Sequence, residues 1–129
     1  MIAAQELAGI PLFAALSDAE RERLAADFVE NTAEAGSRLI GEGARGYSFF
    51  VLTEGTAAVT AGGEELGRLG PADFFGEIAI LEGTRRTASV TATSRVRMLV
   101  MSAGAFRRLQ AMHPQIAAQI ATTVQRRQG

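Results

Sequence analysis

The first 30 residues carry a helical pattern of apolar and polar positions. Ser17 and Glu20 have the spacing of a capping box, in which each side chain can bond the backbone amide of the other residue. Leu24 and Phe28 follow four residues apart and give the helix an apolar face. A shorter helical segment upstream is indicated by the apolar residues Leu7, Ile10, Leu12, Phe13 and Leu16. We therefore predict an N-terminal helical segment over residues 1–34.

From about residue 36 the pattern changes to short apolar runs separated by glycine. Such runs are too short for helices and are typical of strands in sandwiches and barrels. Gly62 and Gly63 can form a two-residue hairpin turn. Residues 87–93 alternate between alanine or valine on one face and hydroxyl side chains on the other, so one face belongs to the core. The predicted strands are Tyr47–Thr53, Thr56–Ala61, Glu64–Leu69, Thr87–Thr93 and Val96–Met101.

The C-terminal part returns to a helical pattern. One helix is predicted over Ala105–Met112, and a second begins at Pro114, because proline is tolerated at the first helical position. The second helix has an apolar stripe of residues four apart, namely Ile116, Ile120 and Val124. Two interpretations of this stripe remain open: the helix is docked on the core, or it is a mobile lid.

Length and composition narrow the class of protein. With 129 residues, 47% of them hydrophobic, and a net charge of −1, the chain fits one soluble globular domain. It has no cysteine, and its one histidine, His113, leaves too few ligands for a zinc site, a catalytic triad or a metal-dependent jelly-roll enzyme. No stretch approaches a membrane span, and the N-terminus lacks a signal peptide. We expect a single cytoplasmic domain over residues 1–129, without a metal or membrane contact.

The charges are distributed unevenly along the chain. Residues 1–82 hold all 14 acidic residues and 5 arginines, a net charge of −9, whereas residues 83–129 hold 8 arginines and no acid. A basic half can indicate nucleic acid, an anionic membrane surface or an acidic partner. The alternative, which we favour, is that the two halves pack together and compensate each other.

The stretch FGEIAILEGTRRTASV, residues 75–90, combines one carboxylate with two adjacent arginines. Gly76 permits close backbone approach, and a helical turn after it would direct free amides at an anion. Glu77 cannot bind a phosphate directly, so it is better suited to accept a hydrogen bond from a sugar hydroxyl. Arg86 shares the parity of the apolar face of the next strand, whereas Arg85 shares that of the polar face. Arg86 is therefore the predicted anion ligand; the alternative is a plain salt bridge between Glu77 and Arg86.

This stretch resembles the phosphate-binding cassette of cyclic nucleotide-binding domains, which occur in catabolite-activator-type transcription factors, cyclic-nucleotide-dependent kinases and cyclic-nucleotide-gated channels. The likeness rests on FGE, an apolar run and Arg-x-Ala at set distances. PLFAALSDAERERLA is similar to the N-terminal helices of that family, and GEGARGYSFFVLTEG to a glycine-marked strand pair. The resemblance implies a mainly β fold with flanking helices: an antiparallel β-roll of jelly-roll type over 35–102, with hinge and lid helices over 103–129.

The resemblance also implies a ligand and its binding residues. The ligand would be cyclic AMP or cyclic GMP, with Glu77 on the ribose 2′-hydroxyl and Arg86 on the cyclic phosphate. The phosphate cradle would be completed by the backbone amides of Gly76, Glu77, Ile78 and Ala88. Thr87 follows the arginine, as in channel-type domains, where the hydroxyl contacts phosphate or a syn guanine. Because alternation puts Thr87 on the other face, this contact requires an irregular start of the strand.

The family likeness extends to the base pocket and its lid. Val59 and Leu69 fall where the family lines the base pocket, and the candidate lid residues are Ile116, Ile120 and Val124. In one departure, this chain has Gly46-Tyr47 where the family usually has Gly-Asp. That aspartate is generally regarded as structural, so the departure concerns the hydrogen bonds of its loop more than the ligand.

We therefore predict a cyclic nucleotide sensor that is not an enzyme, needs no cofactor besides its ligand, and signals through its C-terminal helices. Its output would be an effector protein, a fused effector domain or a homodimer, with no nucleic acid or membrane partner. One alternative is a cassette-bearing protein-interaction module that binds no nucleotide and docks through the basic half. A second alternative, a nucleic-acid binder, is disfavoured because the arginines are scattered and lack interleaved aromatic residues.

Overall fold

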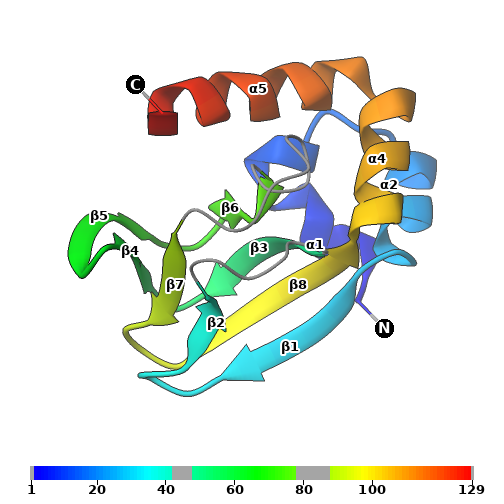
Figure 1. Ribbon diagram of the computed structural model, residues 1–129. Helices are drawn as coiled ribbons and strands as arrows, with labels where there is room; N and C mark the ends of the chain where they lie inside the picture. The colour runs from blue at the N-terminus through cyan, green and yellow to red at the C-terminus, as the bar shows by residue number, and fades with distance from the viewer. Residues whose placement is uncertain (1, 42–47, 78–87, 129) are drawn as a thin grey trace.

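The computed structural model describes residues 2–41, 48–77 and 88–128. In Figure 1, strands form a roll in the lower half, and helices from both ends of the chain lie above and beside it. The helices are α1 (Ala4–Ala8), the 3-10 helix η1 (Pro11–Phe13), α2 (Asp18–Ala25), α4 (Ala103–Met112) and α5 (Pro114–Gln128). The strands are β1 (Val29–Ala33), β2 (Arg38–Ile40), β3 (Ser48–Glu54), β4 (Ala57–Ala61), β5 (Glu64–Leu69), β6 (Phe74–Phe75), β7 (Ser89–Ala92) and β8 (Val96–Ser102).

The strands of the described residues form two four-stranded antiparallel sheets. Their orders are β1-β8-β3-β6 and β2-β7-β4-β5, so strands that follow one another in the chain often belong to different sheets. The predicted fold class, an antiparallel β-roll with an N-terminal helical segment and two C-terminal helices, is confirmed. The predicted hairpin turn is also confirmed, because Gly62 and Gly63 both have positive φ, 58° and 80°, as a two-residue turn between β4 and β5 requires.

The N-terminal helices end earlier than the sequence pattern predicts. The prediction of a helical segment through residue 34 was wrong at its C-terminal end. α2 stops at Ala25, and Val29–Ala33 form the strand β1, which pairs with β8 along its whole length. Phe28 is buried, but it reaches the core from the turn after the helix and packs edge-to-face on Phe13, with ring centroids 5.9 Å apart. The non-local pairing with β8 overrides a local spacing that suited a longer helix.

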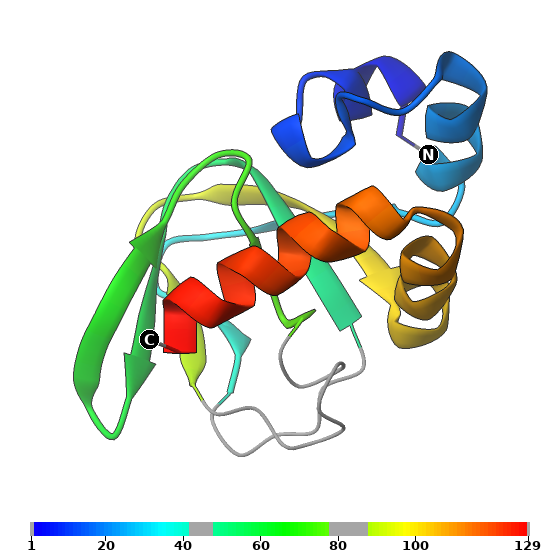
Figure 2. The ribbon, with the colours of Figure 1, turned by 90° about the horizontal axis from the view of Figure 1, so that it is seen from above.

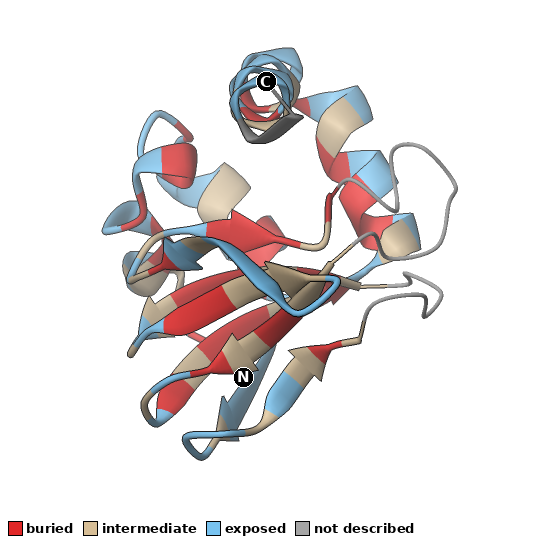
Figure 3. Ribbon diagram, turned by 60° about the vertical axis from the view of Figure 1, so that its left-hand side comes forward, coloured by how far each residue is buried: buried red, intermediate tan, exposed pale blue. Residues whose placement is uncertain are grey.

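Two hydrophobic cores share the first sheet. Phe49 and Val51 of β3 face the helices, whereas Leu52 of the same strand faces the second sheet. The rings of Phe49 and Phe106 stack with centroids 4.5 Å apart and join β3 to α4. Figure 3 shows buried positions along these strands, interrupted by positions of intermediate exposure. The core inside the roll contains Ile40, Leu52, Ala57, Leu69, Phe75, Val90, Ala92, Val96 and Met98.

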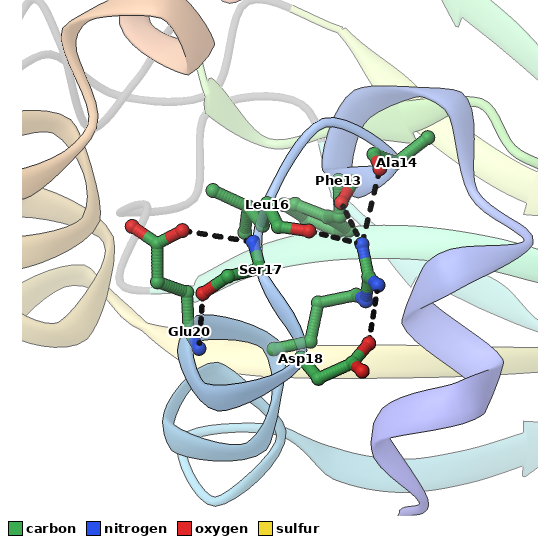
Figure 4. A network of polar contacts seen from close by, with 7 residues as sticks. Phe13, Ala14, Leu16, Ser17, Asp18 and Glu20 are labelled. Atoms are coloured by element: carbon green, nitrogen blue, oxygen red, sulfur yellow. Dashed lines mark hydrogen bonds and ion pairs between the residues drawn. The ribbon is translucent and has the colours of Figure 1, made fainter.

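The capping box at the start of α2 forms as predicted. The Ser17 amide donates to Glu20 Oε1 at 2.8 Å, and the Glu20 amide donates to Ser17 Oγ at 3.2 Å, as Figure 4 shows. In the next position Arg21 donates to the backbone carbonyls of three residues before the helix and pairs with Asp18 at 2.8 Å. These bonds satisfy carbonyl groups at the end of η1 and hold the N-terminal segment in one shape.

Several ion pairs of the described residues join the acidic half of the chain to the basic half. Most ion pairs among the described residues join one half to the other, namely Arg95–Glu34, Arg97–Glu6, Arg97–Glu30 and Arg108–Asp27. Arg97 is the centre of this pattern. It donates to Glu30 at 2.8 Å and to Thr53 at 3.1 Å, and its contact with Glu6 fixes α1 on the sheet.

Candidate functional site

Glu77 is a fully buried carboxylate that follows β6, the shortest strand of the described residues. β6 pairs with β3, and the rings of Phe75 and Phe50 stack at 4.8 Å, which holds this strand inside the roll. Gly76 follows with φ of 90°, a conformation that only glycine adopts without strain, and Glu77 comes next with 0% of its surface exposed. Burying an ionisable group costs free energy unless it is compensated, so such groups gather at functional sites. Glu77 is the strongest site candidate in the described residues.

An apolar wall lies on the inner face of the second sheet. Val59 of β4 is opposite Val90 of β7, and Ala57 is opposite both Leu69 of β5 and Ala92 of β7. Leu69 is buried, and Val59 is half-buried against the same core. These side chains are entirely apolar, so this wall can pack against a flat ring but cannot read its polar edge.

The structure brings only part of the predicted site together. Phe75, two residues before Glu77, belongs to the same core as Leu69 and Val90, so the strand that leads to Glu77 packs on the apolar wall. Ala88 lies just before β7 and is half-buried. Three predicted ligand residues, Ile78, Arg86 and Thr87, lie outside the described residues, as do Arg85 and Gly46-Tyr47.

The apolar stripe of α5 packs mainly on the helices. Ile116 and Ile120 are buried in the core that contains Phe13 and Phe106, away from the wall of the roll. Val124, one turn further, is only partly buried against the same core. Figures 1 and 2 show α5 running above the roll, from α4 on one side towards the β4–β5 hairpin on the other. The docked interpretation therefore fits the first half of α5, and its second half extends over the roll.

A comparison with protein families identifies the family to which this β-roll belongs. The family model described as "Cyclic nucleotide-binding domain" matches residues 30–113. The chain belongs to this family. The match begins within β1 and ends at His113, so it contains both sheets, Glu77 and α4. The predicted resemblance is thereby confirmed.

Relatives of this cyclic nucleotide-binding domain include proteins of different kinds. The chain is 39% identical over 112 residues to a cAMP-dependent protein kinase regulatory subunit of Mycosarcoma maydis, covering 80% of the chain and 21% of that protein. It is 33% identical over 126 residues to a protein of Rhodopseudomonas palustris named as a potassium channel protein, covering 95% of the chain and 31% of that protein. The chain thus spans less than a third of the length of these relatives.

A solved structure supports the fold of the family. "cAMP bound PfPKA-R (141-441)" superposes with a TM-score of 0.89 at 23% identity, covering 97% of this chain and 43% of that one. At this level of identity the likeness concerns the fold alone. In the ranges that the structure describes, none of the helices has the length and apolar character needed to cross a membrane.

The sequence pattern did not reveal two residues that tie the N-terminal helices to the rest of the fold. His113 is the junction between α4 and α5, as expected, but its side chain also contacts Glu20 of α2, with 3.5 Å between Nδ1 and Oε2. The two residues are 93 positions apart, and no periodicity within one element connects them. Arg97 was likewise not singled out, because its partners lie in three other elements.

Proposed function

We propose that this chain is a regulatory module that binds a cyclic nucleotide inside the β-roll and transmits binding through α4 and α5. The observation that carries the proposal is the buried carboxylate of Glu77, two residues after Phe75 of the core inside the roll, in a chain of this family. A carboxylate accepts hydrogen bonds from hydroxyl groups, and an apolar wall packs on a base. A ribose and its base fit these two neighbouring surfaces.

The roles of individual residues follow from this arrangement. Glu77 accepts from the ribose 2′-hydroxyl, and the positive φ of Gly76 lets the backbone pass close to the sugar and phosphate. Val59 and Leu69 contact the base. Arg86 neutralises the cyclic phosphate as a bidentate partner, an assignment that rests on its place in the sequence motif. The relative named as a cAMP-dependent regulatory subunit favours cyclic AMP as the ligand.

Signal transmission is a shift between positions of the C-terminal helix. A ligand moves such an equilibrium only by its difference in affinity for the two states. Ile116 and Ile120 anchor the first half of α5 on the helices, so the part free to respond is the second half, which carries Val124. Closure of this half over the base would make α5 the output element.

The effector is a partner protein, a fused domain or a second copy of the chain. A kinase regulatory subunit and a protein named as a potassium channel protein both share this module, which supports a function as a sensor coupled to different outputs. In this proposal residues 1–129 act as one binding unit that carries out no catalysis. The lack of cysteine suits a cytoplasmic location, where disulfides do not form.

Thermal unfolding with cyclic AMP, cyclic GMP and plain AMP tests the function. A ligand that binds only the folded state at a hundredfold excess over its Kd adds about 2.7 kcal/mol to stability. We expect the midpoint to rise with at least one cyclic nucleotide and to stay unchanged with AMP. If neither cyclic nucleotide shifts the midpoint, the chain is not a cyclic nucleotide sensor.

A further inference from the structure

The turn before β6 contains a strained residue. Residues 70–73 join β5 to β6, and the Asp73 amide donates to the Gly70 carbonyl at 3.1 Å, which closes a four-residue β-turn. Pro71 is the second residue of this turn, and Ala72 is the third, with φ of 77°. A positive φ at the third position is the mark of a type II turn and favours glycine there. Ala72 is the one non-glycine residue with a positive φ in the described part of the chain, so its Cβ strains the turn.

The strained conformation is imposed by hydrogen bonds to β3. The Ala72 amide donates to the Leu52 carbonyl at 2.7 Å, and the Leu52 amide donates to the Asp73 carbonyl at 2.8 Å. These two bonds continue the antiparallel pairing of β6 with β3 into the turn. Strained backbone persists only where its surroundings fix it, and it gathers at sites that hold a ligand. The turn therefore sets the register in which β6 lies on β3.

The carboxylate of Asp73 holds this turn closed. Its Oδ2 accepts the backbone amide of Gly70 at 2.8 Å, so both the side chain and the amide of Asp73 bond to the same residue. Such a bond from an aspartate to a nearby amide favours one shape of the backbone. Asp73 is exposed at the surface, and its side chain acts on the turn rather than on the interior of the roll.

The position of Glu77 depends on this register. Between Asp73 and Glu77 the chain has only Phe74, Phe75 and Gly76. Phe74 belongs to the core next to the helices, whereas Phe75 belongs to the core inside the roll. Because side chains alternate along a strand, a slip of β6 by one residue would exchange these two rings and move the buried carboxylate along β3.

We propose that Asp73 is a positioning residue for the sugar site: by fixing the turn at residues 70–73 on β3, it holds the carboxylate of Glu77 where it meets the ribose 2′-hydroxyl. This inference rests on the proposed function and deepens it. Asp73 acts through Glu77 and does not touch the ligand. Its loss should therefore reduce the selectivity for the hydroxyl group, an effect that a merely structural role would not have.

The measured quantity is the ratio of the affinities for cyclic AMP and 2′-deoxy cyclic AMP, from calorimetric titration. Asp73→Ala removes the acceptor of the Gly70 amide and should lower this ratio about fivefold, the equivalent of one ordinary hydrogen bond. The variant should fold, because an exposed side chain and a single hydrogen bond are lost. Asp73→Asn keeps an acceptor oxygen in the same place and should retain most of the wild-type ratio.

Ser94→Ala is the matched control, because Ser94 Oγ also accepts a backbone amide in a turn, that of Thr56, at 3.0 Å. This contact lies beyond the C-terminal end of β3, whereas β6 runs towards the N-terminal end of β3 and so carries Glu77 away from it. Whatever this substitution costs in stability, it should keep the wild-type ratio. The proposal is overturned if Asp73→Ala keeps that ratio, or if Asp73→Asn or Ser94→Ala lowers it as much as Asp73→Ala does.

Hydrogen exchange of the Ala72 and Leu52 amides in the nucleotide-free protein separates this inference from the proposed function. These amides donate the two bonds between the turn and β3, so their protection relative to the amides of β8 should fall about fivefold or more in Asp73→Ala and stay at the wild-type level in Asp73→Asn. If no cyclic nucleotide binds to the wild type, the proposed function fails. The exchange result then decides alone whether Asp73 fixes β6, and unchanged protection in Asp73→Ala overturns it.

Discussion

Glu77 and Arg97 show two ways in which this protein uses a buried or half-buried charge. Arg97 keeps 22% of its side-chain surface exposed and contacts Glu6, Glu30 and Thr53, so its charge is matched by carboxylates from two elements. Glu77 is fully buried next to an apolar core. The first arrangement stabilises the fold, and the burial of the second is the reason for assigning Glu77 to the proposed ligand site.

Glu77→Gln should weaken binding of cyclic AMP by about tenfold to a hundredfold, as expected for a hydrogen bond to a charged group of about 1.5–3 kcal/mol. The wild type should bind 2′-deoxy cyclic AMP about as weakly, and the variant, whose amide oxygen is a weaker acceptor than a carboxylate, should distinguish the two ligands much less than the wild type does. Calorimetric titrations of both proteins with both ligands complete the double-mutant cycle. If Glu77→Gln loses equal affinity for both ligands, then Glu77 does not bind the 2′-hydroxyl.

Arg97→Met should lower the free energy of unfolding by about 1–2 kcal/mol, a value reduced because the site is partly exposed to solvent. The hydrogen bond from Arg97 holds the pKa of Glu30 below its ordinary 4.5. A carboxylate with a lowered pKa in the folded state contributes stability above its ordinary value and loses it as the pH falls through the lowered one.

The difference between the wild type and Arg97→Met should therefore be largest near neutral pH and shrink as the pH drops below 4.5. Urea unfolding at several pH values measures it. Arg95→Met is the control, because the Arg95–Glu34 pair is exposed and 3.7 Å long, and it should change stability by less than about 0.5 kcal/mol. A difference that grows with acid would contradict the role of Glu30.

Individual elements here owe their positions to partners far along the chain. β1 is an edge strand with mostly exposed side chains, and only its pairing with β8 makes it a strand. β6 has two residues, yet it contributes Phe74 to one core and Phe75 to the other and so places Glu77. α5 is divided between a packed first half and a second half above the roll. This division separates its structural role from its proposed role as a lid.

Ile120→Ala and Val124→Ala should affect different properties of the protein. Ile120 is fully buried, so its truncation should cost about 2–4 kcal/mol of stability through lost packing and a residual cavity. Val124 is only partly buried, so Val124→Ala should lower the free energy of unfolding by less than about 1 kcal/mol. The same substitution should weaken cyclic nucleotide binding severalfold if α5 closes over the base. Urea unfolding and calorimetric titration of both variants make the comparison. Unchanged affinity in Val124→Ala would remove this residue from the lid.

At the scale of the whole molecule, the two charged halves of the chain hold each other. The acidic N-terminal half contributes Glu6, Asp27, Glu30 and Glu34, and the basic C-terminal half contributes Arg95, Arg97 and Arg108. Among the described residues, these three arginines of the basic half are therefore matched by carboxylates of the acidic half.

Raising the ionic strength should lower the stability of the whole protein, because these pairs are at least partly exposed and are screened once the Debye length falls below about 10 Å. We expect a loss of about 1–2 kcal/mol between about 0.01 M and 0.5 M sodium chloride, from several pairs of less than about 1 kcal/mol each. Urea unfolding at both salt concentrations tests this. Greater stability at high salt would show that repulsion within each half outweighs attraction between them.

Several structural elements of this protein can be predicted from short-range features of its sequence. The capping box at Ser17, the Gly62-Gly63 turn and the two C-terminal helices involve residues a few positions apart, so local hydrogen bonds and backbone preferences suffice to predict them. The FGE motif likewise predicted Glu77 as a site residue and indicated the family, and the family model confirms the latter.

Only the tertiary structure decided which residues meet across the chain. It turned Val29–Ala33 into a strand, buried Glu77, placed Ile116 and Ile120 in the helical core and brought His113 to Glu20. In each case the deciding interaction joins residues many positions apart, and its free energy depends on packing and desolvation that no local pattern encodes. The sequence therefore specified the family and predicted the chemistry of the candidate site, and the fold determined which distant residues meet.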